Sequence, residues 1–248
     1  MSKVLLITGA SRGIGAETAR LAAERGYRLC LNYHRSADAA ESLCQSIVDN
    51  GGEAITLQAD VADENQVMAM YAAIDEHFGR LDGLVNNAGI LEGQSDLVDM
   101  SVDRWKRILD ANVIGSFLCA REAVKRMSTR CGGDGGAIVN VSSRAADLGA
   151  PHEYVDYASA KSAVDAMTIG LAKEVGDQGI RVNAVKPGLI YTDIHASGGE
   201  PGRVDRLKAQ VPMQRGGTAT EVAEAILWLL SDASAYTTAS FIDISGGR

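Results

Sequence analysis

A tyrosine and a lysine four residues apart, Tyr157 and Lys161, are the side chains of this sequence best suited to move a proton. Residues at this spacing share one face of a helix. A tyrosine hydroxyl has an ordinary pKa of about 10, and a neighbouring ammonium group lowers that pKa because it favours the phenolate. The pair could therefore act as an acid and base near neutral pH, although an ordinary pair on a helix surface has the same spacing. Tyr154 lacks such a partner, whereas Ser142 and Ser143 precede Tyr157 at the predicted end of a strand.

Three glycines, Gly9, Gly13 and Gly15, lie between the first predicted strand and the first predicted helix, in the sequence TGASRGIG of residues 8–15. Glycines in this place allow a tight turn, close approach of the backbone to a pyrophosphate, and close packing of helix on strand. An ordinary strand-to-helix loop is the alternative, but the position in the first such turn favours nucleotide binding. Ser11, Arg12 and Ile14 complete the predicted phosphate-binding turn.

The end of the second predicted strand carries basic residues. In a dinucleotide-binding fold, side chains at this place contact the adenosine ribose of the cofactor. The sequence there is NYHRS, residues 32–36, and no carboxylate occurs before Asp38. An acidic residue at this place favours the 2′-hydroxyl of NAD, whereas a basic one favours the 2′-phosphate of NADP. His34 and Arg35, joined by Arg12, therefore predict a preference for NADP(H), with NAD(H) possible as well. The alternative is that these residues are solvated loop charges.

Short apolar runs alternate with longer amphipathic stretches along the whole chain, a pattern typical of βαβ units around a parallel sheet. We expect strands at residues 4–8, 28–33, 54–58, 83–85, 137–141, 181–185 and 241–244. The expected long helices cover residues 14–25, 38–50, 64–78, 103–127, 154–176 and 219–231. The predicted fold is a single α/β domain over residues 1–248, a doubly wound, seven-stranded parallel Rossmann sheet with helices on both faces. Residues 192–212 are the least patterned and are expected to form a mobile lid loop over the site.

Composition excludes several classes of protein. The chain has 248 residues, 46% of them hydrophobic, and a net charge of −8, which argues against disorder and against a nucleic-acid or anionic-membrane surface. No apolar run is long enough to span a membrane, and the amino terminus lacks the apolar core of a signal peptide. The four cysteines, 14, 75 and 12 residues apart, include no CxxC pair and suit neither a metal site nor a disulfide framework. We therefore expect a cytoplasmic protein with free thiols and no metal.

With these residues together, the chain resembles the short-chain dehydrogenase/reductase family over essentially its whole length. The elements that carry the resemblance are the glycine turn of residues 8–15, Asp60-Val61, Asn86-Asn87-Ala88-Gly89, Asn112, Ser143, Tyr157 with Lys161, and Pro187-Gly188. The resemblance implies that Tyr157 is the general acid or base and that Ser143 hydrogen-bonds the substrate oxygen. It further implies that Lys161 holds the nicotinamide ribose and lowers the pKa of Tyr157, and that Asn112 anchors a proton-relaying water.

The same resemblance implies the remaining cofactor contacts. Asp60, followed by Val61, would accept from the adenine amino group. Asn87, Ala88 and Gly89 would line the adenosine ribose, and Pro187, Gly188, Ile190 and Thr192 would pack against the nicotinamide end.

These residues lead to one main expectation of function and two alternatives. We expect an NADPH-dependent carbonyl reductase, or the matching alcohol dehydrogenase, close in type to 3-oxoacyl carrier-protein reductases and acting on a small molecule. A sugar or polyol dehydrogenase of the same family is one alternative, and a catalytically silent NADP-binding regulator is the other. Members of the family are commonly tetramers, so a homotetramer built through the helices at 103–127 and 154–176 is expected.

Overall fold

The fold is built on one parallel sheet, seen in a computed structural model that describes residues 2–248. The seven strands are β1 (Val4–Ile7), β2 (Arg28–Tyr33), β3 (Glu53–Gln58), β4 (Gly83–Asn86), β5 (Gly136–Val141), β6 (Ile180–Pro187) and β7 (Phe241–Ile244). Their order is β3-β2-β1-β4-β5-β6-β7, and every neighbouring pair is parallel. The predicted doubly wound, seven-stranded α/β fold is therefore confirmed.

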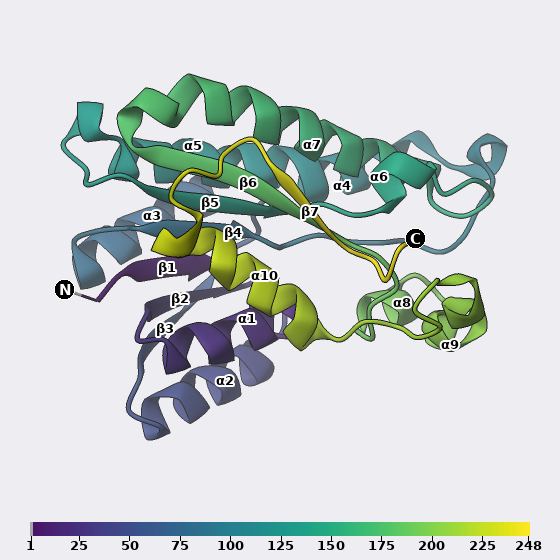
Figure 1. Ribbon diagram of the computed structural model, residues 1–248, viewed down its shortest axis with the longest axis horizontal. Helices are drawn as coiled ribbons and strands as arrows, with labels where there is room; N and C mark the ends of the chain where they lie inside the picture. Colours follow the sequence, from purple (N-terminus) through teal and green to yellow (C-terminus); the bar gives the residue numbers. More distant parts are fainter. Residues whose placement is uncertain (1) are drawn as a thin grey trace.

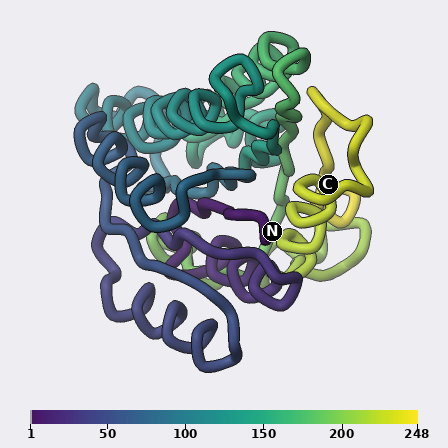
Figure 2. The backbone as a smooth tube through the Cα atoms, turned by 90° about the vertical axis from the view of Figure 1, so that its left-hand side faces the viewer, coloured from purple at the N-terminus to yellow at the C-terminus, as the bar shows by residue number. Residues whose placement is uncertain are grey.

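Helices cover both faces of the sheet, as Figures 1 and 2 show. One face packs against α3 (Glu64–Phe78), α5 (Gly115–Met127) and α7 (Val155–Val175), and the other against α1 (Gly13–Glu24), α2 (Ala37–Asp49) and α10 (Ala219–Leu230). Each face has its own apolar cluster, which explains why the central strands are continuous apolar runs. Within residues 2–248, no helix combines the length and the apolar character that a membrane crossing requires.

The long helix expected at residues 103–127 is interrupted in its middle. It consists of α4 (Val102–Leu109), a π-helical segment (Asp110–Ile114) and α5. The Gly115 N–H donates to the Asp110 carbonyl five residues back, which is the wider hydrogen-bond step of a π-helix. Asn112 lies in this segment and is fully buried. The expectation of one regular helix was therefore wrong, because a hydrophobic pattern does not show where the backbone widens.

The segment expected to be a loop, residues 192–212, contains regular structure. It holds α8 (Ile194–Ser197) and α9 (Arg203–Leu207), followed by a 3₁₀ turn (Lys208–Gln210). The hydroxyl of Tyr154 donates to the Gly198 carbonyl at 3.3 Å, and Arg203 donates to Glu153 at 2.8 Å. Both contacts join this segment to residues 153–154, about 50 residues earlier in the chain. They hold in place a segment whose own sequence has little helical periodicity. In Figure 1, α8 and α9 lie at the right-hand end of the sheet, beyond the carboxyl ends of the strands.

Candidate active site

A cavity of about 740 Å³ opens at the carboxyl ends of the strands. It extends from the turn after β1 to the helices α8 and α9, across the point between β1 and β4 where the strand order reverses. Ligands of open parallel sheets bind at such a point. The predicted site residues that line it are Gly9, Ser11, Arg12, Gly13, Ile14, His34, Arg35, Asp60, Val61, Asn87, Ala88, Gly89, Ser143, Tyr157, Lys161, Pro187, Gly188, Ile190 and Thr192. The predicted residues Gly15 and Asn112 do not line it and lie behind its wall.

The glycine turn after β1 has the backbone that its sequence predicts. Gly9 and Gly13 have φ angles of 62° and 56°, in the left-handed region that favours glycine. A Cβ atom at Gly15 would lie 2.5 Å from the Gly9 carbonyl oxygen, so this position has no room for a side chain. The Asn87 amide donates to the carbonyls of Thr8 and Gly9 at 2.8 and 3.0 Å, which joins the turn to the end of β4. The turn and the first residues of α1 thus form a fixed cradle suited to phosphate.

Asn32 is a structural residue of this site that sequence reasoning missed. Its Oδ1 accepts from the Gly9 N–H at 3.2 Å, and its Nδ2 donates to the carbonyls of Leu57 and Ala59 at 3.2 and 3.1 Å. One buried amide therefore links the glycine turn with the ends of β2 and β3. An asparagine within a strand of otherwise apolar or aromatic buried residues was the available signal.

The far end of the cavity from Tyr157 is polar and carries Arg12 and Arg35. His34 Nδ1 lies 3.8 Å from Asp60 Oδ2, and Asp60 Oδ1 accepts from the Ala62 N–H at 3.0 Å. Arg12 and Arg35 are exposed, line the cavity and make no side-chain hydrogen bond or ion pair with residues 2–248. Two guanidinium groups are therefore free at this end to bind a phosphate.

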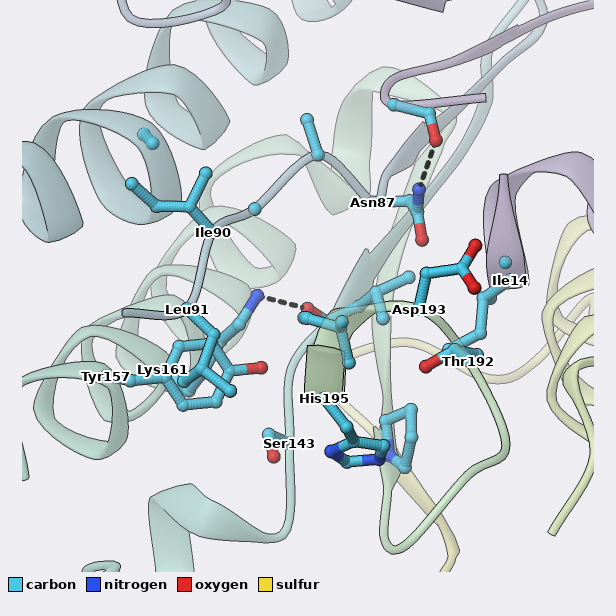
Figure 3. A pocket seen from close by; sticks show the side chains of 18 of the residues that line it. Ile14, Asn87, Ile90, Leu91, Ser143, Tyr157, Lys161, Thr192, Asp193 and His195 are labelled. Carbon is cyan, nitrogen blue, oxygen red and sulfur yellow. Dashed lines mark hydrogen bonds between the residues drawn. The ribbon is translucent and has the colours of Figure 1, made fainter. Parts of the chain in front are cut away.

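Tyr157, Lys161 and Ser143 meet at the other end, as Figure 3 shows. Lys161 Nζ donates to the Val141 carbonyl at 2.8 Å and lies 5.6 Å from the centre of the Tyr157 ring. Ser143 lines the cavity, and its Oγ accepts from the Ala145 N–H at 3.1 Å. Ser142 instead donates to Asp165 at 2.6 Å. Both serines line the cavity. The Ser142 hydroxyl donates its proton to Asp165, whereas Ser143 Oγ accepts from Ala145 and keeps its own proton to donate.

The pKa values of this group differ from the expectation for Tyr157. Burial raises the pKa of Tyr157 to about 12, and the nearby Ser143 hydroxyl opposes this only in part. The expected net lowering of the Tyr157 pKa is not reached, because burial raises it by more than the neighbouring groups lower it. Burial lowers the pKa of Lys161 to about 8, against the opposing charge of Asp165. At neutral pH both groups are therefore mainly protonated.

Asn112 lies behind Gly89 with one hydrogen-bonding atom unused. Its Nδ2 donates to the carbonyls of Ile90 and Ile108 at 3.1 and 2.9 Å, while its Oδ1 is buried and has no partner among residues 2–248. A Cβ atom on Gly89 would lie 2.6 Å from this Oδ1 and 3.6 Å from Lys161 Nζ. A buried acceptor of this kind requires a donor, and a water is the usual one.

Comparison with known proteins agrees with this geometry. The family model described as "Enoyl-(Acyl carrier protein) reductase" matches residues 9–248. An uncharacterized oxidoreductase of Escherichia coli strain K12, YgfF, is 58% identical over 245 residues, covering 99% of both chains. The 3-oxoacyl-[acyl-carrier-protein] reductase FabG of Staphylococcus aureus is 36% identical over 100% of this chain and 98% of its own length. A short-chain dehydrogenase from Burkholderia cenocepacia, solved in complex with NADP, superposes with a TM-score of 0.91 at 32% identity, over 99% of this chain and 97% of that chain.

The chain belongs to the short-chain dehydrogenase/reductase family. The resemblance found from its motifs is confirmed, and the protein is an oxidoreductase of this family.

The end of the cavity beside α8 and α9 contains side chains that were not named among the predicted site residues, although His195 and Arg203 lie in the segment 192–212 that was expected over the site. Glu153, Tyr154, His195 and Arg203 line the cavity there. The guanidinium of Arg203 lies 5.2 Å from the centre of the Tyr154 ring, so the ion pair with Glu153 and the aromatic ring form one wall. These residues come from two segments far apart in the sequence, 153–154 and 195–203, and no motif spacing connects the two segments.

Proposed function

We propose that this short-chain dehydrogenase/reductase is an NADPH-dependent carbonyl reductase in which Tyr157 is the general acid. The observation that carries this proposal is the meeting of Tyr157, Ser143 and Lys161 in a cavity whose other end carries Arg12 and Arg35. In the reverse direction the same residues would oxidise a secondary alcohol.

NADP(H) is the cofactor that the chemistry of these residues fits best, with NAD(H) possible. The glycine cradle would hold the pyrophosphate, and Arg12 and Arg35 would bind the 2′-phosphate. Asp60 would face the adenine, Asn87, Ala88 and Gly89 the adenosine ribose, and Pro187, Gly188, Ile190 and Thr192 the nicotinamide. The bound nicotinamide would supply a hydride to the carbonyl carbon. The NADP complex of the Burkholderia cenocepacia relative supports this choice.

The side chains would supply the proton that turns the carbonyl into an alcohol. Tyr157, protonated at neutral pH, donates its proton to the carbonyl oxygen, while the Ser143 hydroxyl donates a hydrogen bond to the same oxygen. The Lys161 ammonium holds the ribose hydroxyls and stabilises the phenolate as it forms. A water held by Asn112 Oδ1 would return a proton toward Lys161 and Tyr157.

An activity assay separates this proposal from its two alternatives. A sugar or polyol dehydrogenase is favoured by one observation, the polar wall of Glu153, Tyr154 and Arg203 at the end beside α8. A silent NADP-binding regulator is disfavoured, because Ser143, Tyr157 and Lys161 are all present and face one cavity.

NADPH oxidation against acetoacetyl thioesters, diketones, sugars and aldehydes in parallel tests the proposal. We expect turnover with at least one of these carbonyl classes. Tight NADPH binding without oxidation across the whole panel would contradict the reductase and support the regulator.

We also propose a cytoplasmic homotetramer. Cys30, Cys44, Cys119 and Cys131 are all free thiols, which suits a reducing compartment. Apolar residues remain exposed along α4 and α5, which suits assembly through these helices.

A further inference from the structure

His195 in α8 has no role in the mechanism above, yet it lines the same cavity. Its exposed fraction is 9%, so the imidazole is buried in the wall. Figure 3 shows the ring extending into the cavity on the side where Ser143 lies. Its Nε2 lies 3.0 Å from the Ile190 carbonyl oxygen, which fixes the orientation of the ring.

That contact determines where the imidazole proton lies. A carbonyl oxygen can only accept a hydrogen bond, so Nε2 carries the proton. Burial lowers the pKa of His195, and the charge of Arg203 acts in the same direction, while the Ile190 carbonyl and Glu200 oppose them. The ring is therefore neutral at neutral pH, and Nδ1 presents a lone pair that can accept.

Nδ1 of His195 is buried and unsatisfied. Among residues 2–248, the buried side-chain polar atoms without a hydrogen-bond partner are Arg28 Nε, Asn112 Oδ1 and His195 Nδ1. Arg28 does not line the cavity, whereas Asn112 lies directly behind Gly89 and His195 forms part of the wall. Leaving a buried acceptor unpaired is costly. Nδ1 has almost no accessible surface of its own, so its partner is expected to come from a bound molecule that displaces the neighbouring wall slightly.

We propose that Nδ1 of His195 accepts a hydrogen bond from a substrate hydroxyl, so that the enzyme prefers carbonyl compounds that carry a hydroxyl group close to the reacting carbonyl. This inference rests on the proposed carbonyl reduction and names its substrate class as hydroxyketones and, in the reverse direction, polyols. The charged and aromatic wall of Glu153, Tyr154 and Arg203 beside His195 suits such polar substrates better than an acyl chain.

Three small ketones show whether the substrate must donate a hydrogen bond or only fit the cavity by size. Hydroxyacetone offers a hydroxyl donor, methoxyacetone keeps the oxygen without the proton, and butanone replaces the hydroxyl by a methyl group. We expect kcat/KM with NADPH to be roughly tenfold to a hundredfold higher for hydroxyacetone than for the other two, because these leave Nδ1 unpaired.

Variants of His195 assign the preference to this residue. His195→Leu is expected to bring the hydroxyacetone-to-butanone ratio of kcat/KM close to one, with NADPH affinity unchanged in a fluorescence titration. His195→Gln, whose amide has both a donor and an acceptor, is expected to retain part of the ratio. His77→Leu, on the exposed surface of α3, is the matched control and should leave the ratio unchanged.

Each outcome decides for or against the inference. Equal kcat/KM for hydroxyacetone and butanone in the wild type overturns it, and so does a full preference in His195→Leu or a methoxyacetone value equal to that of hydroxyacetone. Turnover of diketones or thioesters without turnover of hydroxyacetone also overturns it and leaves carbonyl reduction intact. No NADPH oxidation with any carbonyl compound would instead refute the proposed function. If His195→Leu does not fold, the wild-type ketone comparison and His195→Gln carry the test.

Discussion

We expect the pH dependence of catalysis to follow the titration of Lys161. Burial lowers the pKa of Lys161 to about 8, whereas the pKa of Tyr157 is raised to about 12, so lysine loses its proton first as pH rises. Because the ammonium form binds the ribose and supports Tyr157, kcat/KM for NADPH should be level near neutral pH and fall as pH rises above about 8. A pH profile of kcat/KM for NADPH at saturating carbonyl substrate measures this.

Asp165 provides the matched test, because its charge raises the pKa of Lys161. Asp165→Asn should move the fall in kcat/KM to lower pH, and Asp177→Asn, an exposed residue paired with Arg130, should not. An identical profile in wild type and Asp165→Asn would contradict the assignment of the fall to Lys161.

Arg35 should determine the choice between the two nicotinamide cofactors. Its guanidinium lines the cavity and has no partner among residues 2–248, so a 2′-phosphate would be its first strong contact. Arg35→Ala should weaken NADPH binding roughly tenfold to a hundredfold and NADH binding little, as titrations of protein fluorescence would measure. Arg20→Ala, on the exposed side of α1, is the control. Equal losses for NADPH and NADH would argue against a phosphate contact.

At the scale of elements, a buried ion pair holds the start of α7, where Tyr157 lies. Arg104 in α4 donates to Asp156 at 2.6 and 3.2 Å and to the Gly93 carbonyl at 2.6 Å. Asp156 Oδ1 also accepts from the Tyr157 N–H at 2.9 Å. Both charged side chains are at most 10% exposed, so the ion pair that holds the start of α7 is shielded from solvent.

Removing one partner of this ion pair should therefore destabilise the protein and also disturb the position of the start of α7. Arg104→Leu leaves a buried carboxylate unpaired and should lower the free energy of unfolding by about 3–5 kcal/mol, measured by urea denaturation. It should also lower kcat, because the start of α7 loses its anchor. Adding Asp156→Asn should recover part of the stability. A loss below about 1 kcal/mol would mean that the pair behaves like an exposed one.

At the scale of the whole molecule, the proposed tetramer rests on exposed apolar side chains of α4, the π-helical segment and α5. Val102, Leu109, Ile114 and Phe117 are 44–57% exposed, so these residues do not serve the core of one chain. Phe117→Glu should dissociate the proposed tetramer into smaller species, as size-exclusion chromatography with light scattering would detect. Met68→Glu, on the exposed side of α3, should leave the assembly intact. A monomeric wild type would contradict the tetramer.

The sequence predicts the framework of this molecule well because its signals are local. Apolar runs and helical periodicity define the strands and most helices, and the glycines of the first turn have the left-handed backbone that their positions require. The π-helical segment around Asn112 escaped prediction because a hydrophobic pattern does not show where the backbone widens. The helices at 194–197 and 203–207 escaped it because long-range contacts such as Arg203 with Glu153 hold them. The unused Nδ1 of His195 was equally invisible, since only its contact with Ile190 defines it.

The central claim is that Tyr157 protonates a carbonyl oxygen while NADPH is consumed. Its most direct test is the rate of NADPH oxidation by wild type and Tyr157→Phe on the best carbonyl substrate, with NADPH affinity measured in parallel. We predict that kcat falls by roughly a hundredfold to ten-thousandfold with little change in NADPH affinity, whereas the exposed control Tyr236→Phe keeps its activity. Near-normal turnover by Tyr157→Phe would contradict the account.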